Sequence, residues 1–288
     1  MPVSQKRPRW SIDGLLAALP PVLPLAMEVA MSEPVVLVDK EGGIATVTLN
    51  RPEKLNALNR ELRSTFCRVM QDLRTDREIA VVIITGSGRA FCAGLDLREL
   101  GSSGIREEGN ATFITVIEDM EVPVIAAVNG FAVTGGFELA LACDMIIAAE
   151  DAQFADTHAR VGVMPGGGMS ARLPRAVGIR KAKELSLTGN YLSARDAERM
   201  GLVNRVVPKD QVMTAAREIA AQIQSANQNV VRQMKRLYDL TTRASLHDAL
   251  RIEQDFFRGF NSDSSLRDFE QRRESVMERG RKQSSGKR

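Results

Sequence analysis

The sequence predicts an α/β fold in which buried strands alternate with helices, followed by a C-terminal helical region. Three observations carry this prediction. Short continuous runs of apolar, often β-branched residues occur at 79–86, 124–130 and 145–150, which is typical of strands covered on both faces. Segments with helical periodicity separate these runs. Strand signals almost stop after about residue 190, so the fold ends in helices.

The first third of the chain contains three predicted strands and one helix. Residues 35–49 form two strands around a Glu-Gly-Gly turn. The segment 59–76 has helical spacing, and IAVVIITG (79–86) is a buried strand. One side of the 59–76 helix carries Leu62, Phe66, Val69 or Met70, and Leu73. This side should face the core.

The middle of the chain repeats the alternation of strand and helix. A helix is predicted over about 109–121, and Pro123 opens the buried strand VIAAVNG. A Gly-Gly step then leads into FELALACD, a short apolar helix, and MIIAAE (145–150) is the next strand. The element order is therefore ββα followed by βαβαβ, which indicates an α/β core.

The last third of the chain is predicted to be helical. VNRVVP (203–208) is the last strand signal, and helical segments follow at 210–226, 228–242, 245–260 and 264–280. The 210–226 helix begins behind Asp210 and presents one apolar stripe. The stripe contains Val212, Ala216, Ile219 and Ile223. Such helices should pack on the core of their own chain or on another subunit.

Composition excludes several classes of protein. The 288 residues carry a net charge of only +3, which argues against a nucleic-acid partner. The three cysteines are widely spaced and odd in number, so neither a disulfide framework nor a zinc site is expected. The two histidines lie far apart, which argues against a histidine metal site. A reducing, cytoplasmic setting fits these features.

The first 31 residues differ from the rest of the sequence. Five of the eleven prolines fall within the first 24 positions, and they break the apolar run well short of the ~20 residues that a membrane span needs. Basic residues precede this run (Lys6, Arg7 and Arg9), so a signal peptide remains an alternative. The favoured interpretation is a disordered or over-long extension over 1–31, with Met27 or Met31 as a second initiator.

Two segments share a design that can create an oxyanion hole. GSGRAFCAGLDL (86–97) and NGFAVTGGFELA (129–140) each follow a buried strand and pass through a glycine turn into a predicted helix. Such turns expose main-chain N–H groups, and the helix start adds a partial positive charge. Two of these turns together could direct two donors at one oxygen. The alternative is that the glycines only permit tight turns.

Glu138 favours a catalytic interpretation of the second segment. It lies three residues after Gly135, among glycine, phenylalanine, leucine and alanine residues. Burial of a carboxylate is costly without a partner, and burial would raise the pKa of Glu138 into a range useful for proton transfer. A buried ion pair is the alternative explanation.

Four stretches together resemble one known family. They are LNRPEKLNAL, VIITGSGRAFCAGLDL, PVIAAVNGFAVTGGFELALACD and AQFADTHARVGVMPGGG. In order and spacing they are similar to the crotonase superfamily, the enoyl-CoA hydratase/isomerase family. The resemblance extends over about 32–280 and includes LTGNYLSARDAERMGLVNRVVP. It is specific for the family and much less specific for the reaction.

The resemblance implies a crotonase-like spiral of ββα units and an acyl-CoA thioester substrate. The crotonase core would span 32–190. The C-terminal helical region, 191–288, would build homotrimers, often paired into hexamers. No cofactor is implied beyond the coenzyme A of the substrate, and no metal, membrane or nucleic acid.

The resemblance also transfers roles to individual residues. The oxyanion donors would be the main-chain N–H groups of Leu95 and Gly135. The acyl pocket would be built from loops near 100–120, and RPEKLNAL would lie near the adenine end. The residues implied near coenzyme A are Arg89, Asp96, Leu97 and Arg98. Arg272 and Arg273 could reach the coenzyme A of a neighbouring subunit, or they could simply lie on an exposed helix face.

One position departs from the hydratase pattern. Hydratases of this family use two glutamates to hold and activate water; Glu138 matches the first, whereas the second aligns with His158. A neutral imidazole can accept a proton near pH 7, so we expect Glu138 and His158 to hold one water and add it to a 2-enoyl-CoA. A simpler alternative is that His158 fills space and is hydrogen-bonded to Asp156 or a backbone carbonyl.

Three alternatives to hydration stay open at the level of sequence. An isomerase could use Glu138 alone, because moving a proton between carbons needs one base. Other reactions on the same enolate chemistry occur on this fold. A non-catalytic acyl-CoA-binding protein could retain the oxyanion hole. RNA binding, known in some relatives, is disfavoured by the low net charge and the two tyrosines.

Overall fold

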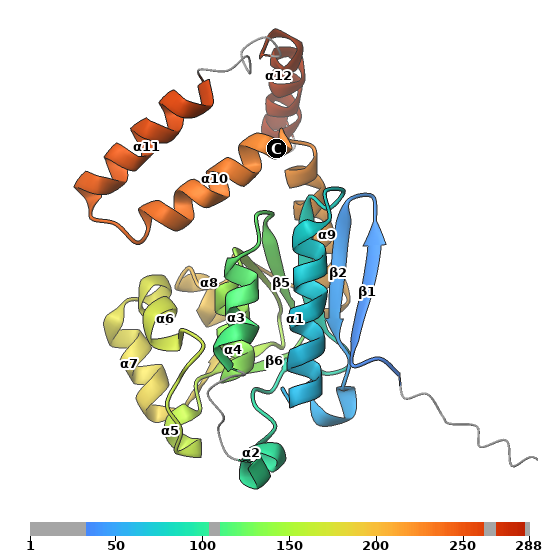
Figure 1. Ribbon diagram of the computed structural model, residues 1–288, viewed down its shortest axis with the longest axis vertical. Helices are drawn as coiled ribbons and strands as arrows, with labels where there is room; N and C mark the ends of the chain where they lie inside the picture. Colours follow the sequence, from blue (N-terminus) through green and yellow to red (C-terminus); the bar gives the residue numbers. More distant parts are fainter. Residues whose placement is uncertain (1–32, 104–109, 262–268, 286–288) are drawn as a thin grey trace, which may run out of the picture. The chain divides into compact units, whose positions relative to one another are not determined.

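The computed structural model describes residues 33–103, 110–261 and 269–285 and confirms the α/β class. Two β-sheets and a set of helices make up the part after residue 33 (Figure 1). The extension expected over 1–31 lies outside the described residues, as does part of the expected acyl-pocket loop, 104–109.

The larger sheet has six strands and contains the predicted apolar runs. β1 and β2 are antiparallel, as the Glu-Gly-Gly turn predicts, and each later strand is parallel to its neighbour. Every residue of β3 and β5 is buried, which explains why these strands are continuously apolar. In spatial order the strands are β1 (Val36–Glu41), β2 (Ile44–Leu49), β3 (Val81–Gly86), β5 (Val124–Val128), β7 (Met145–Ala149) and β10 (Arg205–Val207).

The second sheet has four short strands that the sequence patterns did not predict. They are β4 (Ala90–Cys92), β6 (Phe131–Val133), β8 (Gln153–Ala155) and β9 (Tyr191–Ser193). Each has three residues, too few for a periodicity to show. The pairs β3–β4, β5–β6 and β7–β8 each place one strand in either sheet and are followed by a helix. This repetition is the expected spiral of ββα units.

The main chains of two successive ββα units approach each other closely, just before β4 and just before β6. A side chain on Gly130 would place its Cβ 2.1 Å from the carbonyl oxygen of Arg89. Only glycine fits there. The chain can therefore pass from β5 into β6 directly beside β4.

The predicted helix over 59–76 is α1 (Arg60–Thr75). The Asn59 side chain accepts a hydrogen bond from the Leu62 N–H at 2.9 Å and caps its N-terminus. Its buried residues are Leu62, Phe66, Met70 and Leu73. Of the two alternatives at this point, Met70 is the buried one, and Val69 is half-buried and also packs against the core. The ring of Phe66 lies 4.7 Å from that of Phe113 in α3 (Asn110–Glu118), measured between centroids. This contact joins α1 to α3.

Short helices follow or connect the strands of the second sheet in the chain and carry the residues of interest. They are α2 (Leu97–Ser103), α4 (Gly135–Ala142), α5 (His158–Val161), α6 (Met169–Val177), α7 (Ile179–Thr188) and α8 (Ala194–Arg199), with single 3₁₀ turns at Pro52–Lys54 and Lys209–Gln211. Helix α4 packs on β4, β6 and α6. It therefore lies at the centre of the candidate site.

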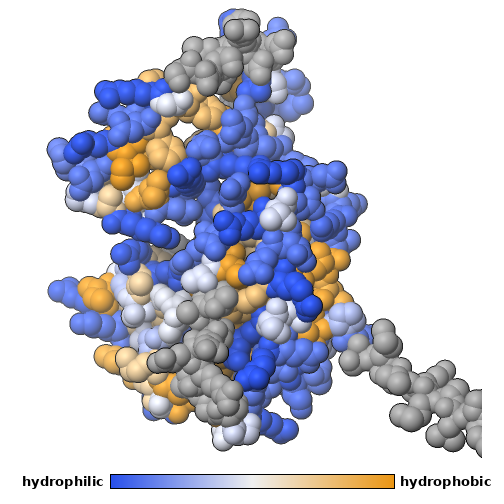
Figure 2. Space-filling view, viewed as in Figure 1, coloured by the Kyte–Doolittle hydropathy of each residue, from blue (hydrophilic) through white to orange (hydrophobic). Residues whose placement is uncertain are grey.

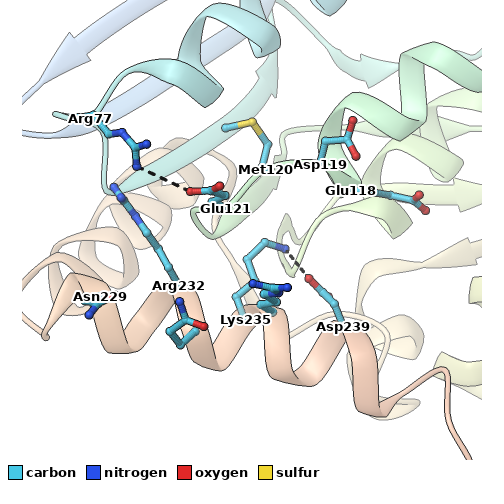
Figure 3. A pocket seen from close by; sticks show the side chains of 11 residues that line it. Arg77, Glu118, Asp119, Met120, Glu121, Asn229, Arg232, Lys235 and Asp239 are labelled. Atoms are coloured by element: carbon cyan, nitrogen blue, oxygen red, sulfur yellow. Dashed lines mark ion pairs between the residues drawn. The ribbon is translucent and has the colours of Figure 1, made fainter. Parts of the chain in front are cut away.

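The four predicted C-terminal helices are present: α9 (Val212–Gln224), α10 (Gln228–Thr241), α11 (Leu246–Asn261) and α12 (Phe269–Ser285). Helix α9 packs on β3, β5 and β7. Helices α10 and α11 contact each other and extend away from the sheets (Figure 1). A cavity of about 400 Å³, lined mainly by charged and polar side chains, separates α10 from the segment 118–121 (Figure 3). Within 33–103, 110–261 and 269–285, no helix is long and apolar enough to cross a bilayer.

Candidate active site

The two predicted oxyanion donors come together at the N-terminus of α4. Gly135 is the first residue of this helix, and Leu95 lies between β4 and α2. A Cβ built on Gly135 would lie 3.8 Å from the Leu95 nitrogen and 3.7 Å from the Cα of Gly94. Within the described ranges, neither N–H is a donor in a protein hydrogen bond. Two free donors therefore lie side by side, as an oxyanion hole requires.

Unusual main-chain conformations produce this arrangement. Thr134, the residue before α4, has φ of +53°, which is rare for a β-branched residue and common at functional sites. Its N–H donates to the Ala155 carbonyl at 2.8 Å, and its hydroxyl lies 2.5 Å from that of Thr157. Gly94 has φ of +89°, and a Cβ there would approach the Val133 carbonyl to 2.8 Å. The donors are thus held by contacts across β6 and β8.

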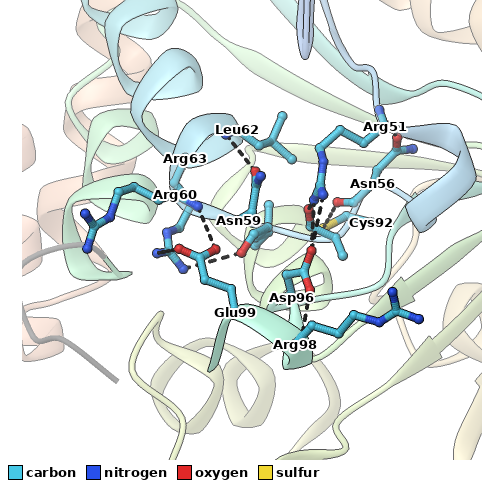
Figure 4. A network of polar contacts seen from close by, with 12 residues as sticks. Arg51, Asn56, Asn59, Arg60, Leu62, Arg63, Cys92, Asp96, Arg98 and Glu99 are labelled. Carbon is cyan, nitrogen blue, oxygen red and sulfur yellow. Dashed lines mark hydrogen bonds and ion pairs between the residues drawn. The ribbon is translucent and has the colours of Figure 1, made fainter. Parts of the chain in front are cut away.

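An ion pair fixes the loop that carries Leu95 (Figure 4). Both terminal nitrogens of Arg51 lie 3.2 Å from Oδ2 of Asp96, and one also donates to the Ala57 carbonyl. The buried Asn56 accepts from the Arg51 N–H at 2.8 Å and donates to the Ala90 carbonyl at 2.8 Å. Burial raises the pKa of Asp96, but the hydrogen bonds from Arg51 and from the main chain outweigh it and leave the pKa lowered. Asp96 thus keeps the charge that holds the loop.

The residues implied near coenzyme A lie around this loop. Arg89 is exposed in the turn before β4, and Leu97 and Arg98 are exposed at the start of α2. Asp96 is turned toward Arg51 instead. Arg272 and Arg273 are exposed on α12. Three of the four implied side chains near 89–98 are therefore accessible to a ligand.

Glu138 lies one helical turn after Gly135 and is 5% exposed. Its Oε1 accepts the N–H groups of Gly167 at 2.8 Å and Met169 at 3.2 Å. Burial raises the pKa of Glu138, and these two hydrogen bonds together with the neighbouring imidazole only partly oppose it. Since Oε1 is occupied by two donors, Oε2 is the oxygen left to exchange a proton.

His158 lies directly opposite Glu138, at the first position of α5. Its Nε2 is 3.9 Å from Oε2 of Glu138, and both side chains are buried. Its Nδ1 is 2.6 Å from Oδ1 of Asp156. The sequence left two alternatives for His158, a pair with Glu138 or a hydrogen bond to Asp156. In the structure His158 contacts Asp156 and also faces Glu138, so the two are compatible.

Sequence reasoning missed the residues that support the site. Arg51 and Asn56 were not singled out, and Asp156 was considered only as a structural partner of the histidine. The Asp-x-His spacing was the available signal for Asp156, whereas nothing in the sequence links Arg51 to Asp96, 45 residues away. Within the described ranges, no group of three His, Cys, Asp or Glu side chains could hold a metal ion.

Two adjacent main-chain donors and a buried carboxylate–imidazole pair, on a spiral of ββα units, are an arrangement suited to stabilising an enolate. The sequence matches the family model described as "Enoyl-CoA hydratase/isomerase" over residues 39–282, so the chain belongs to this family. It is 39% identical over 264 residues to "Probable enoyl-CoA hydratase 1, peroxisomal" of Arabidopsis thaliana, covering 91% of this chain and 100% of the relative.

Other relatives and solved structures agree. The "Short-chain-enoyl-CoA hydratase" of Clostridium acetobutylicum is 39% identical, with 77% of this chain and 87% of the relative covered. The crystal structure of an enoyl-CoA hydratase from Bacillus anthracis has a TM-score of 0.79 at 35% identity, covering 84% of this chain and 96% of that one. The Mycobacterium smegmatis enoyl-CoA hydratase reaches 48% identity with a TM-score of 0.64, covering 78% and 99%.

Proposed function

We propose that this protein is an enoyl-CoA hydratase that adds water across the double bond of a 2-enoyl-CoA. The observation that carries the proposal is the buried pair of Glu138 and His158, 3.9 Å apart, one helical turn from two free main-chain donors. A hydratase needs groups that exchange protons with water and donors for the thioester oxygen. The names of the relatives support the same activity.

The separation of the pair suits one bridging water. At 3.9 Å, Nε2 of His158 and Oε2 of Glu138 are too far apart for a direct hydrogen bond. A water about 2.8 Å from each atom would see them at an angle of about 90°, which hydrogen bonding to one oxygen tolerates. The two side chains would thus hold the attacking water from two sides.

The reaction balances with these groups alone. Nε2 of His158 takes a proton from water while the water oxygen bonds to the β-carbon. The electron pair of the carbon–carbon double bond moves toward the thioester oxygen, where the N–H groups of Leu95 and Gly135 stabilise the enolate. Protonated Oε2 of Glu138 then gives its proton to the α-carbon. Proton return from His158 to Glu138 restores the starting state, so we propose no cofactor beyond the coenzyme A of the substrate.

We assign the coenzyme A phosphates to the exposed surface around α2. Arg89 and Arg98 provide guanidinium groups for phosphate, and Leu97 provides apolar surface beside them. The small net charge argues against nucleic acid as a partner. The three free, separate cysteines fit a reducing cytoplasmic location, which we also propose.

We further propose a homotrimer or a dimer of trimers built through α10 and α11. Large apolar side chains are exposed along these helices, and Figure 2 shows apolar surface there at the upper left. They include Met234, Tyr238, Leu240, Leu246 and Leu250. A contiguous exposed apolar surface of this kind commonly marks a protein interface.

The test is turnover of short 2-enoyl-CoA thioesters by the full-length protein. Hydration removes the absorbance of the conjugated thioester and yields a 3-hydroxyacyl-CoA that chromatography identifies. Glu138→Gln, nearly isosteric, should lower turnover by ~10²–10⁴ while acyl-CoA binding by calorimetry persists. Binding without turnover across chain lengths would make the protein a non-catalytic binder. A shifted double bond without hydroxylated product would make it an isomerase.

A further inference from the structure

Asp156 contacts both the main chain and the ring of His158 through a single carboxylate oxygen. Oδ1 of Asp156 accepts the main-chain N–H of His158 at 3.2 Å and lies 2.6 Å from its Nδ1. The side chain of Asp156 is 2% exposed and that of His158 is 7% exposed. The main-chain bond is an ordinary Asx turn, which explains the loop but not the contact with the ring.

The contact with the ring decides which nitrogen carries the proton. An ionised carboxylate only accepts hydrogen bonds, so Nδ1 of His158 must be the donor. In the neutral imidazole this leaves an unprotonated lone pair on Nε2. Nε2 is the atom that lies 3.9 Å from Glu138. The ring therefore presents a base, not a donor, to the candidate water site.

The surroundings of Asp156 keep it ionised. Burial raises its pKa, but hydrogen bonds from the ring of His158, the Ser186 side chain and the His158 main chain outweigh this, so the pKa is lowered. Ser186 comes from α7, and Glu138 faces the imidazole from α4. A buried negative charge beside Nδ1 would stabilise the imidazolium formed when Nε2 takes a proton from water.

We propose that Asp156 is a positioning residue for hydration, which fixes the tautomer of His158 and stabilises its protonated form during the reaction. The proposal rests on the hydratase function above, because it assigns Asp156 a role only through His158. It also explains how an imidazole can replace a carboxylate at this position. Asp156 supplies the negative charge that the imidazole lacks.

Nitrogen NMR tests the tautomer without any substrate. The chain has only two histidines, and the second, His247, is exposed on α11. In ¹⁵N-labelled protein near pH 8, the imidazole of His158 should carry its proton on Nδ1, and His158→Ala identifies the signals. Asp156→Asn should shift the signals of His158 and leave those of His247 unchanged. A proton on Nε2 in the wild-type protein would overturn the proposal, even if the variant failed to fold.

Kinetics separate this proposal from the hydratase function. Asp156→Asn should lower kcat on the order of 10²-fold with KM changed only a few-fold. The matched control Asp151→Asn, an exposed carboxylate paired with Lys209 at 3.0 Å, should leave both unchanged. If His158→Ala is slow but Asp156→Asn has wild-type kcat, Asp156 has no positioning role and the hydratase proposal stands. If His158→Ala hydrates normally, the role of His158 fails, and that of Asp156 with it.

Discussion

Gly135→Ala should remove most of the hydratase activity and leave the protein folded. The new methyl group would lie 3.8 Å from the Leu95 nitrogen and beside the N–H of residue 135 itself. An oxyanion bound about 2.9 Å from both nitrogens needs the same space. The methyl group should therefore displace the thioester oxygen from at least one donor.

The magnitudes of the two effects can be estimated separately. Loss of one oxyanion donor costs ~10²–10³ in turnover, or about 2.7–4 kcal/mol. For stability, alanine is preferred over glycine in helices by at most about 1 kcal/mol. Among the described residues, the tightest contact of the methyl group is with Cδ1 of Leu58 at 3.2 Å, the end of a buried but rotatable side chain. Overpacking of this kind costs about 1–3 kcal/mol. The net loss of unfolding free energy should therefore lie between about 0 and about 3 kcal/mol.

Urea unfolding and steady-state kinetics on one preparation measure both effects. Gly136→Ala is the matched control for stability, because its Cβ would lie 2.0 Å from the Cys92 carbonyl oxygen, a main-chain atom that cannot rotate away. That variant should be strongly destabilised, whereas Gly135→Ala should unfold near the wild-type midpoint. A stable Gly135→Ala protein with wild-type kcat would refute the assignment of the oxyanion hole.

Four further predictions address the donor, the histidine, the core and the assembly. Leu95→Ala should lower turnover only slightly, whereas Leu95→Pro should lower it by ~10²–10³, because only proline removes the main-chain N–H. An equal loss of turnover in the two folded variants would contradict a main-chain donor. His158→Glu restores the carboxylate pair that the resemblance implies for hydratases and should raise the hydration rate above that of His158→Ala; no gain over His158→Ala would count against a water-holding role. Burial raises the pKa of Cys92 from 9.0 to about 12. The stability contributed by its neutral thiol is therefore present below pH 9 and is lost as pH rises toward 12, so the unfolding free energy should fall by about 1.4 kcal/mol per pH unit in this range. Cys92→Ser should make this fall less steep in urea unfolding, and an unchanged dependence on pH would show that Cys92 does not titrate. Light scattering should show a trimer or hexamer at micromolar concentration and smaller species for Leu250→Asp, whereas a wild-type monomer would exclude the assembly.

The sequence predicted the larger sheet better than the smaller one, for a physical reason. β3 and β5 are buried on both faces and therefore appear as continuous apolar runs. β4, β6 and β8 have three residues each, so neither periodicity nor composition marks them. Their positions follow from main-chain approaches such as that of Gly130 to Arg89, which depend on the folded arrangement.

The candidate site was predictable where it depends on main-chain chemistry and family spacing. Glycine turns before helices indicated two segments that could form an oxyanion hole, the resemblance placed the donors at Leu95 and Gly135, and an isolated carboxylate in an apolar helix indicated Glu138. The supporting contacts were not predictable, because they depend on side-chain conformations. Arg51 contacts Asp96, which is 45 residues away in the sequence, and the Asp156 side chain contacts the ring of His158, two residues further on. Spacing alone cannot distinguish such contacts from solvated side chains.

The way α10 is attached has a consequence for how this protein can diverge. None of the residues of α10, all of which the structure describes, is buried. Its links to the sheets include Lys235 to Asp144 at 2.6 Å and Arg232 to the Ile79 carbonyl at 3.2 Å, and the side chains of Lys235 and Arg232 also line the charged cavity. Polar links of this kind constrain few neighbouring residues, unlike an interlocked apolar core. If α10 and α11 build the proposed assembly, substitutions in them can therefore accumulate and change subunit pairing while the catalytic unit keeps its stability, so quaternary structure and chemistry could evolve independently.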